Sequence, residues 1–125
     1  MAAKTNLLNA ILLIFLIYPP TAGGQAGLPA GERRAIEQLI AEIEGLTGAT
    51  FIRNGRDYTA DAAARFLRGK WRTKKRDVLS VEDFIAKVAS HSSTTGEPYR
   101  ISFSDGRETP LAPFLRTLLR DRRSR

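Results

Sequence analysis

The octet FIRNGRDY, Phe51 to Tyr58, has the pattern of a β-hairpin centred on Asn54-Gly55. An Asn-Gly pair is typical of two-residue type I′ turns, because both central positions of such a turn need a positive φ. This turn would set Phe51 opposite Tyr58 as a cross-strand aromatic pair, worth up to about 1 kcal/mol over Ala-Ala. It would also set Arg53 opposite Arg56 beside the turn, where we expect both side chains in solvent. We interpret the octet as a clip that joins two helices, with a binding role for its tip as the alternative.

An amphipathic stretch lies on each side of the octet. Before it, apolar residues recur at the spacing of one helical face from Ile36 to Leu46, with Pro29 just ahead. After it, Thr59 is placed to N-cap a second helix, whose apolar stripe runs from Ala60 to Trp71. The periodicity therefore predicts one helix before the hairpin and one after it.

A third helix is expected to begin after Ser80. Asp83 follows three residues later, which is close to a capping box. The apolar positions from Val81 to Ala89 then fall on one helical face. A polar loop at residues 91–98 separates this helix from the next strand.

A second hairpin and a last helix complete the pattern. Tyr99, Ile101 and Phe103 alternate as on one face of a strand, and Asp105-Gly106 follow as a turn. Thr109-Pro110 is expected to start the last helix, as a cap residue followed by Pro at the first helical position, with Ala112 as the alternative start. The sequence thus predicts an α+β fold, a small single domain of about four helices with two short β-hairpins.

Residues 1–26 have the layout of a secretory signal peptide. Lys4 supplies a positive charge, residues 7–17 form a nearly unbroken apolar run, and small residues allow cleavage near residues 24–26. The apolar run is shorter than the roughly 20 residues of a membrane-spanning helix. We therefore expect a periplasmic or secreted protein that does not span the membrane after cleavage. The expected division of the chain is signal peptide 1–26, globular domain 27–120 and basic C-terminal tail 121–125.

Four stretches of the chain resemble the YfeK-like family of small exported bacterial proteins, which is catalogued as a domain of unknown function. They read FIRNG, AARFLRGKW, VEDFIAKVASHSSTTGEPY and PLAPFLRTLL. The resemblance covers nearly the whole expected mature chain, and it implies a periplasmic setting and a small helical domain with short strands. It implies no activity. The chain departs from the family at Phe66-Leu67-Arg68, where the family often has His-Leu-Arg.

The composition argues against most catalytic chemistry. The chain has no Cys and a single His, His91, whereas zinc sites need several Cys or His ligands. Ser90-His91-Ser92 holds nucleophile and base types, but neighbours in sequence rarely aim at one another, and no Gly-x-Ser-x-Gly elbow is present. The carboxylates of the first and third helices are explained by solubility and capping. We therefore expect no catalytic residues, no metal and no cofactor, and we predict that the protein is not an enzyme.

The excess of basic residues is the strongest departure from average composition. The chain has 20 Lys and Arg against 13 Asp and Glu, a net charge of +7. Cations recur every three or four residues along the second helix, opposite its apolar stripe, and a further Arg-rich block ends the chain. These cations are either a solvated helix face or a surface for an anionic partner in the cell envelope, such as lipid headgroups, lipopolysaccharide or an acidic protein. Nucleic acid is not expected, because no reader motif is present. The predicted anion-binding residues are Arg65, Arg68, Arg72, Lys75 and Arg76.

The loop after the third helix is an alternative site for a small ligand or peptide. Its hydroxyls and Gly96 suit a backbone cradle for a carboxylate or phosphate, and Arg68 would reach it if the second and third helices pack together. In the competing interpretation the hydroxyls bond the end of the third helix and shape the turn into the next strand. The residues of this alternative site are Ser92, Ser93, Thr95, Gly96 and Tyr99.

Overall fold

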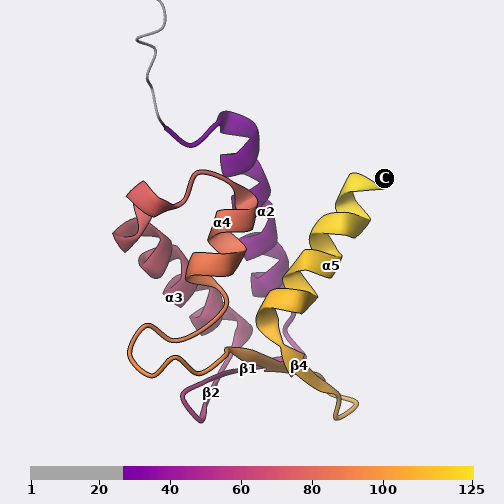
Figure 1. Ribbon diagram of the computed structural model, residues 1–125. Coiled ribbons are helices and arrows are strands. Elements are labelled where there is room, and N and C mark those ends of the chain that lie inside the picture. The colour runs from indigo at the N-terminus through magenta and orange to yellow at the C-terminus, as the bar shows by residue number, and fades with distance from the viewer. Residues whose placement is uncertain (1–26) are drawn as a thin grey trace, which may run out of the picture.

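Four helices stand on one side of a four-stranded antiparallel sheet in the computed structural model, which describes residues 27–125 (Figure 1). The strand order is β2-β1-β3-β4. The predicted α+β class with two hairpins is therefore confirmed. The expected signal peptide at residues 1–26 lies outside the described residues.

The first two helices form the largest helix pair of the domain. α2 spans Ala30–Gly45 and α3 spans Ala60–Thr73, and they pack against each other through their predicted apolar faces. The Thr59 hydroxyl accepts a hydrogen bond from the Ala62 amide at 3.2 Å, which confirms Thr59 as the N-cap of α3. The buried residues of these two helices are Ile36, Leu39, Ile40, Ile43, Ala60, Ala63, Ala64 and Leu67.

The octet forms the predicted hairpin between these helices. β1 spans Thr50–Arg53 and β2 spans Arg56–Tyr58, with Phe51 paired to Tyr58 as expected. Asn54 has a φ of 52° and Gly55 a φ of 75°, so both turn positions adopt the positive φ that a type I′ turn needs. This geometry supports the interpretation that the octet is a structural hairpin joining the two helices.

The prediction that both turn arginines lie in solvent is wrong for Arg53. Its guanidinium lies 4.3 Å from the centre of the Phe66 ring and 5.2 Å from the centre of the Tyr58 ring. It also donates a hydrogen bond to the Tyr58 hydroxyl at 3.1 Å. Arg56 is exposed as expected. The two arginines differ because aromatic faces attract a cation, and α3 places one beside Arg53 only.

The third helix begins as predicted but changes geometry after one turn. α4 spans Val81–Asp83 and continues as a π-helix, η3, over Phe84–Val88. The Ala89 amide donates to the Phe84 carbonyl five residues earlier, at 3.1 Å. The Ser80 hydroxyl caps the helix by accepting from the Asp83 amide at 3.0 Å, while the Asp83 carboxylate accepts from the Leu79 amide instead of completing a capping box. The predicted inner face, Val81, Phe84, Ile85, Val88 and Ala89, is fully buried.

The second hairpin joins the first in one sheet, which the sequence pattern did not predict. β3 spans Arg100–Ser102 and β4 spans Glu108–Pro110. Ile101 of β3 pairs with Phe51 of β1, so the two hairpins share one continuous ladder. Gly106 has a φ of 90° at the predicted turn.

The last helix starts one residue later than its expected Pro start. α5 spans Leu111–Arg123, with Pro110 as its N-cap, and Thr109 belongs to β4 instead of capping the helix. Thr109 lies in the sheet, where it pairs with Ile101, and so it does not cap the helix. α5 also includes residues 121–123, which were assigned to the basic tail.

One hydrophobic core holds the helices on the sheet. Its largest fully buried side chains come from every helix and from β3, and they include Phe84, Ile101 and Leu115. Within residues 27–125, no helix combines the length and the apolar character that a membrane crossing requires.

Candidate functional site

A groove on the domain surface collects most of the predicted anion-binding residues. It has a volume of about 670 Å³ and lies between the start of α2, the second half of α3 and the segment that leads to α4. That segment includes a 3₁₀ turn, η2, over Lys75–Asp77. The residues that line the groove are Gly27, Leu28, Arg33, Glu37, Arg68, Trp71, Arg72, Lys75, Arg76 and Leu79.

Four of the five predicted cations line this groove, and one does not. Arg68, Arg72, Lys75 and Arg76 are all among its lining residues. Arg65 lies on the first half of α3, where it pairs with Asp61 at 3.4 Å. The sequence predicted these four residues together because they recur at the spacing of one helical face. The structure places them along the end of α3 and in η2.

A fifth groove cation, Arg33, comes from α2 and was missed by the sequence analysis. On its own helix Arg33 is one of several charged residues near the N-terminus. Only the packing of α2 against α3 brings it to the groove, and the apolar periodicity does not specify which polar residues of α2 border α3.

Most groove cations are free of protein carboxylates. Arg68 forms an ion pair with Glu44 at 3.4 Å. In contrast, the other four groove cations form no ion pair with any residue of the described chain: Arg33, Arg72, Lys75 and Arg76. Glu37 is the only carboxylate among the described lining residues. The groove therefore has a net positive charge that the fold itself does not neutralise.

Apolar side chains share the groove with these cations. Trp71 was predicted on the inner stripe of α3; it is half-buried and packs edge-on against Phe84, with ring centres 5.8 Å apart, while it also lines the groove. Leu79 is 51% exposed, the one large hydrophobic side chain in the described range that is mainly in solvent. Leu28 is a third apolar lining residue. The groove thus offers both positive charge and apolar surface.

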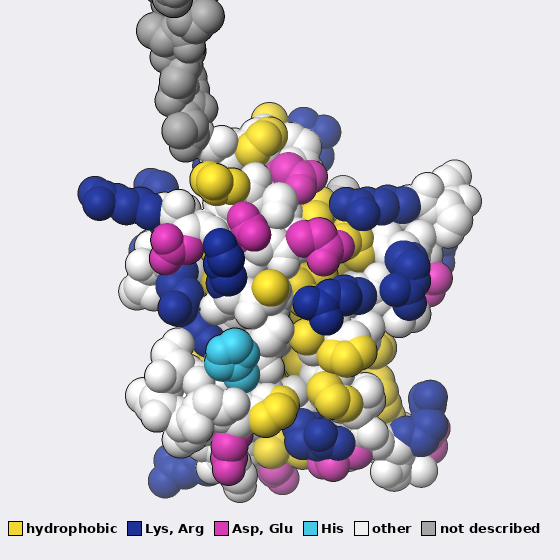
Figure 2. All heavy atoms as spheres, in the orientation of Figure 1, with side chains coloured by type: hydrophobic (Ala, Val, Ile, Leu, Met, Phe, Trp, Pro, Cys, Tyr) yellow, Lys and Arg dark blue, Asp and Glu magenta, His cyan; other side chains and the backbone are white. Residues whose placement is uncertain are grey.

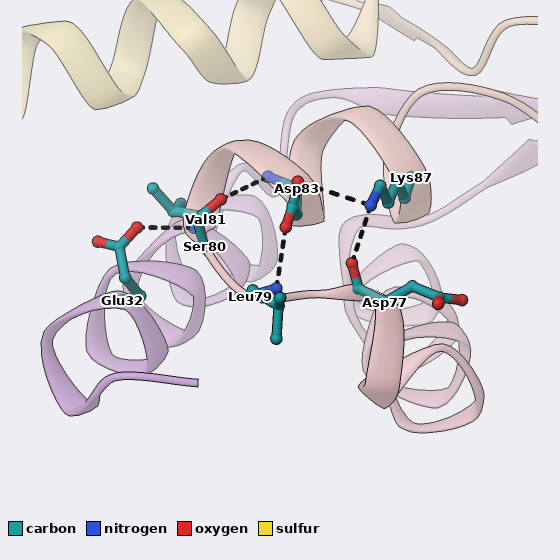
Figure 3. A network of polar contacts seen from close by, with 7 residues as sticks. All are labelled: Glu32, Asp77, Leu79, Ser80, Val81, Asp83 and Lys87. Carbon is teal, nitrogen blue, oxygen red and sulfur yellow. Dashed lines mark hydrogen bonds and ion pairs between the residues drawn. The ribbon is translucent and has the colours of Figure 1, made fainter. Parts of the chain in front are cut away.

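A hydrogen-bond network holds the segment that carries Leu79 (Figure 3). Backbone amides of this segment donate to two carboxylates: Leu79 to Asp83 at 3.0 Å, and Val81 to Glu32 of α2 at 3.1 Å. Lys87 donates to the Asp77 carbonyl at 3.1 Å, which holds the other end of the segment. The side chain of Leu79 points away from the network (Figure 3). This wall of the groove is therefore held by backbone contacts that leave Leu79 exposed.

The Arg-rich end of α5 is a second basic region, separate from the groove. On the face shown in Figure 2, Lys and Arg side chains gather over α5 and, apart from them, around the turn that follows α3. Two α5 arginines have acidic partners: Arg116 pairs with Glu82 at 3.7 Å, and Arg122 pairs with Glu42. Part of this second region therefore helps to attach α5 to the other helices.

The Ser/Thr loop is organised by its own hydroxyls. Ser92 is buried, and its hydroxyl accepts hydrogen bonds from the amides of Thr94 at 3.2 Å and Thr95 at 3.3 Å. The Thr95 hydroxyl donates to the Asn54 side chain at 2.6 Å, which joins the loop to the turn of the first hairpin. Gly96 has a φ of 77°. Ser93 is exposed at the surface of the loop. These contacts agree with the interpretation in which the hydroxyls shape the loop, but none of them bonds the end of the third helix, as that interpretation also expected.

Lys70, and not Arg68, is the cation that reaches this loop. Its ammonium donates to the His91 carbonyl and to the Tyr99 hydroxyl, each at 2.8 Å. Burial, together with the positive charges of Lys74 and Arg53, lowers the pKa of Lys70 to about 8. Sequence reasoning missed Lys70 because it lies off the regular basic stripe.

The described residues contain no group of three or more His, Cys, Asp or Glu placed to hold a metal ion. The described residues also include clusters of cations, the hydroxyls of the Ser/Thr loop and two pockets. Of these, the groove brings together the most residues that were predicted to act together.

Comparison with known proteins gives a family and a relative of this chain. Residues 30–123 match the model of a family of unknown function, DUF5329. A protein of Salmonella typhimurium (strain LT2) described as uncharacterized protein YfeK is 31% identical over 94 residues, which are 75% of this chain and 75% of that protein. No solved structure matches the chain. The chain therefore belongs to this family of unknown function, the YfeK-like family that its motifs resemble.

Proposed function

We propose that the domain is an exported, non-enzymatic binding module whose basic groove binds the phosphate groups of anionic envelope lipids. The observation that carries this proposal is a set of four cations that share one groove and have no acidic partner in the described chain, namely Arg33, Arg72, Lys75 and Arg76. Cations that only solubilise a helix have no reason to gather in a groove. A negatively charged ligand would supply the missing counter-charge.

The apolar residues of the groove support a lipid over a purely polar anion. Trp71 and Leu79 lie beside the cations, and Leu79 is exposed although leucine is normally buried. Trp is favoured at membrane interfaces, because one part of its side chain is apolar and the other is polar. An amphiphile with a phosphate head and an acyl body satisfies both parts of the groove. Phospholipid and lipopolysaccharide share this chemistry.

Vesicle cosedimentation tests the proposal. Each cation near an anionic surface contributes about 1 kcal/mol, so losing three should weaken binding on the order of 100-fold. The wild-type domain, residues 27–125, should pellet with phosphatidylglycerol vesicles and stay in the supernatant with phosphatidylcholine vesicles. Raising the salt should release it, because the Debye length falls from about 10 Å at 0.1 M to about 3 Å at 1 M.

Two triple variants with the same loss of charge make the test specific to the groove. The groove variant is Arg72→Gln, Lys75→Gln and Arg76→Gln. The control variant is Arg120→Gln, Arg123→Gln and Arg125→Gln in and after α5. Only the groove variant should lose vesicle binding, with little change in melting temperature for either. Equal loss from both variants would show a diffuse charge effect, and a wild type that ignores both vesicles would contradict a lipid ligand.

Further arms separate the sources of the phosphate. Lipopolysaccharide aggregates replace phosphatidylglycerol in one arm, and inorganic phosphate competes with vesicles in another. Because inorganic phosphate lacks the apolar body, it should compete weakly. Competition as strong as that of soluble short-chain phosphatidylglycerol would identify a simple anion site with no role for Trp71 and Leu79.

A further inference from the structure

A second cavity, distinct from the basic groove, lies between α3 and the sheet. It has a volume of about 160 Å³, it is partly open to solvent, and its surface is almost entirely apolar. It shares no lining residue with the groove. The residues that line it are Phe51, Ile52, Arg53, Tyr58, Ala62, Ala63, Arg65, Phe66, Leu67, Tyr99, Arg100 and Leu111.

The cavity has the size and surface of a site for a compact apolar group. Its volume is close to that of an apolar cavity of about 150 Å³ that is large enough to hold benzene. Here the walls combine aromatic rings, including Phe51 and Phe66, with aliphatic side chains. Filling such a space with an apolar group restores the dispersion contacts that the lining atoms lack.

Three arginines line this cavity, and two of them have carboxylate partners. Arg65 pairs with Asp61 at 3.4 Å, and Arg100 pairs with Glu108 at 3.1 Å. Arg53 forms no ion pair with any residue of 27–125. It is thus the one cavity-lining cation that the described chain leaves without a counter-charge.

The Arg53 guanidinium is held in place by aromatic faces, not by an acid. It lies over the Phe66 and Tyr58 rings at 4.3 Å and 5.2 Å, and it donates one hydrogen bond, to the Tyr58 hydroxyl. A guanidinium carries five N–H donors in a planar fork that matches a carboxylate. The charge is therefore fixed at the cavity with donors to spare, and Lys70 adds a second positive charge near it.

We propose that this cavity binds a small monocarboxylate with a compact apolar body, with the body in the cavity and the carboxylate on Arg53. The apolar walls select the body, and the unpaired guanidinium selects the charge. Neither a hydrated polar anion nor a neutral hydrocarbon uses both features. This inference is independent of the lipid proposal, because the cavity and the groove have no residue in common.

Titration with benzoate, followed by ¹H–¹⁵N NMR, tests the proposal. Benzoate has an aromatic body of benzene size and a single carboxylate. We expect saturable shifts of the amides around Phe51 and Phe66, with a dissociation constant in the millimolar range or below for so small a ligand. Benzyl alcohol, a neutral probe of similar shape, should bind at least roughly tenfold more weakly, because it cannot form the charge-assisted hydrogen bonds.

Two matched pairs of variants locate the site. Arg53→Gln should weaken benzoate binding at least about tenfold, whereas Arg56→Gln, on the other side of the same turn, should leave it unchanged. Ala62→Leu should abolish binding by filling the cavity, whereas Ala41→Leu, on the exposed face of α2, should have no effect. If Arg53→Gln disturbs the fold, the alanine pair still decides.

Three results would overturn the inference. The first is no saturable shift with benzoate, which would mean that the cavity takes no such ligand. The second is equal affinity for benzyl alcohol, which would make Arg53 irrelevant to recognition. The third is retention of binding in Ala62→Leu, which would place the ligand elsewhere.

Discussion

Gly55 and Asn54 carry the backbone conformation on which the first hairpin depends. Both have positive φ, 75° and 52°. A Cβ atom added at Gly55 would meet no atom within 4 Å beyond its chain neighbours, so the main cost of replacing this glycine comes from its positive φ. The turn therefore isolates one physical effect at one residue.

We expect Gly55→Val to lower the free energy of unfolding by about 1–2 kcal/mol or more, because a β-branched residue resists positive φ. Thermal melts or urea unfolding would measure it. Arg56→Ala in the same turn should stay within about 0.5 kcal/mol of wild type, as exposed surface substitutions do. Similar small losses from the two variants would mean that the turn tolerates L-residues and is not type I′.

The contacts of Arg53 predict an asymmetry between the two turn arginines. Arg53→Ala removes two cation–π contacts and a hydrogen bond, so it should destabilise the domain by about 1–2 kcal/mol. Arg56→Ala serves as the matched control in the same urea unfolding experiment. Equal effects would show that stacking on Phe66 contributes nothing to stability.

The lowered pKa of Lys70 predicts a pH dependence of stability. The folded pKa of about 8 lies below the ordinary value of 10.5, so the unfolded chain binds more protons between these values. Stability should therefore rise with pH through this window, by well under the ~1.4 kcal/mol per pH unit that one unscreened proton allows. Burial raises the pKa of Tyr99 above 10.0, which opposes the rise only at higher pH.

The variant Lys70→Met tests this dependence. Free energies of unfolding at about pH 7.5 and about pH 9.5 should differ less in Lys70→Met than in wild type, since the variant lacks the titrating group. The direction in which the free energy of unfolding changes with pH decides the test. A wild-type stability that rises no more than that of Lys70→Met would contradict the burial of the ammonium.

At the scale of elements, capping and turn signals were the reliable part of the sequence. Thr59 and Ser80 cap α3 and the third helix as predicted, because an N-cap depends on residues within one turn of it. Features that depend on distant pairing were not predictable. Thr109 was expected to cap α5, but it pairs with Ile101 in the sheet instead. The π-helix at Phe84–Val88 likewise has no local signal in its apolar spacing.

The Ser80 cap supports both the third helix and one wall of the groove. Ser80→Ala should cost about 1 kcal/mol, which lowers the melting temperature of a domain of this size by roughly 4–8 °C. Ser93→Ala, in the exposed loop, is the control and should change little. Calorimetry on both variants measures the difference. A Ser80→Ala melting temperature equal to that of the control would mean that the Glu32 and Asp83 contacts hold the helix start without the cap.

At the scale of the whole molecule, the candidate site was only partly predictable from the sequence. Arg72, Lys75 and Arg76 follow a helical period, so their common face was predictable. Arg33 joins them only because α2 packs on α3. Arg68 was considered for the Ser/Thr loop, but Glu44 holds it elsewhere. Arg53 and its cavity depend on how the hairpin meets α3, which no local pattern encodes.

Trp71 is the only tryptophan of the chain, and it lines the groove. Its fluorescence therefore reports occupancy of the proposed site directly, without contribution from the α5 cations or the Arg53 cavity. Titrating the domain with phosphatidylglycerol vesicles should shift Trp71 emission to shorter wavelengths, as the indole moves into a less polar environment. The shift should reverse at high salt, and phosphatidylcholine vesicles should not produce it. Unchanged emission while the domain pellets with the vesicles would place the lipid contact elsewhere and contradict the groove as the functional site.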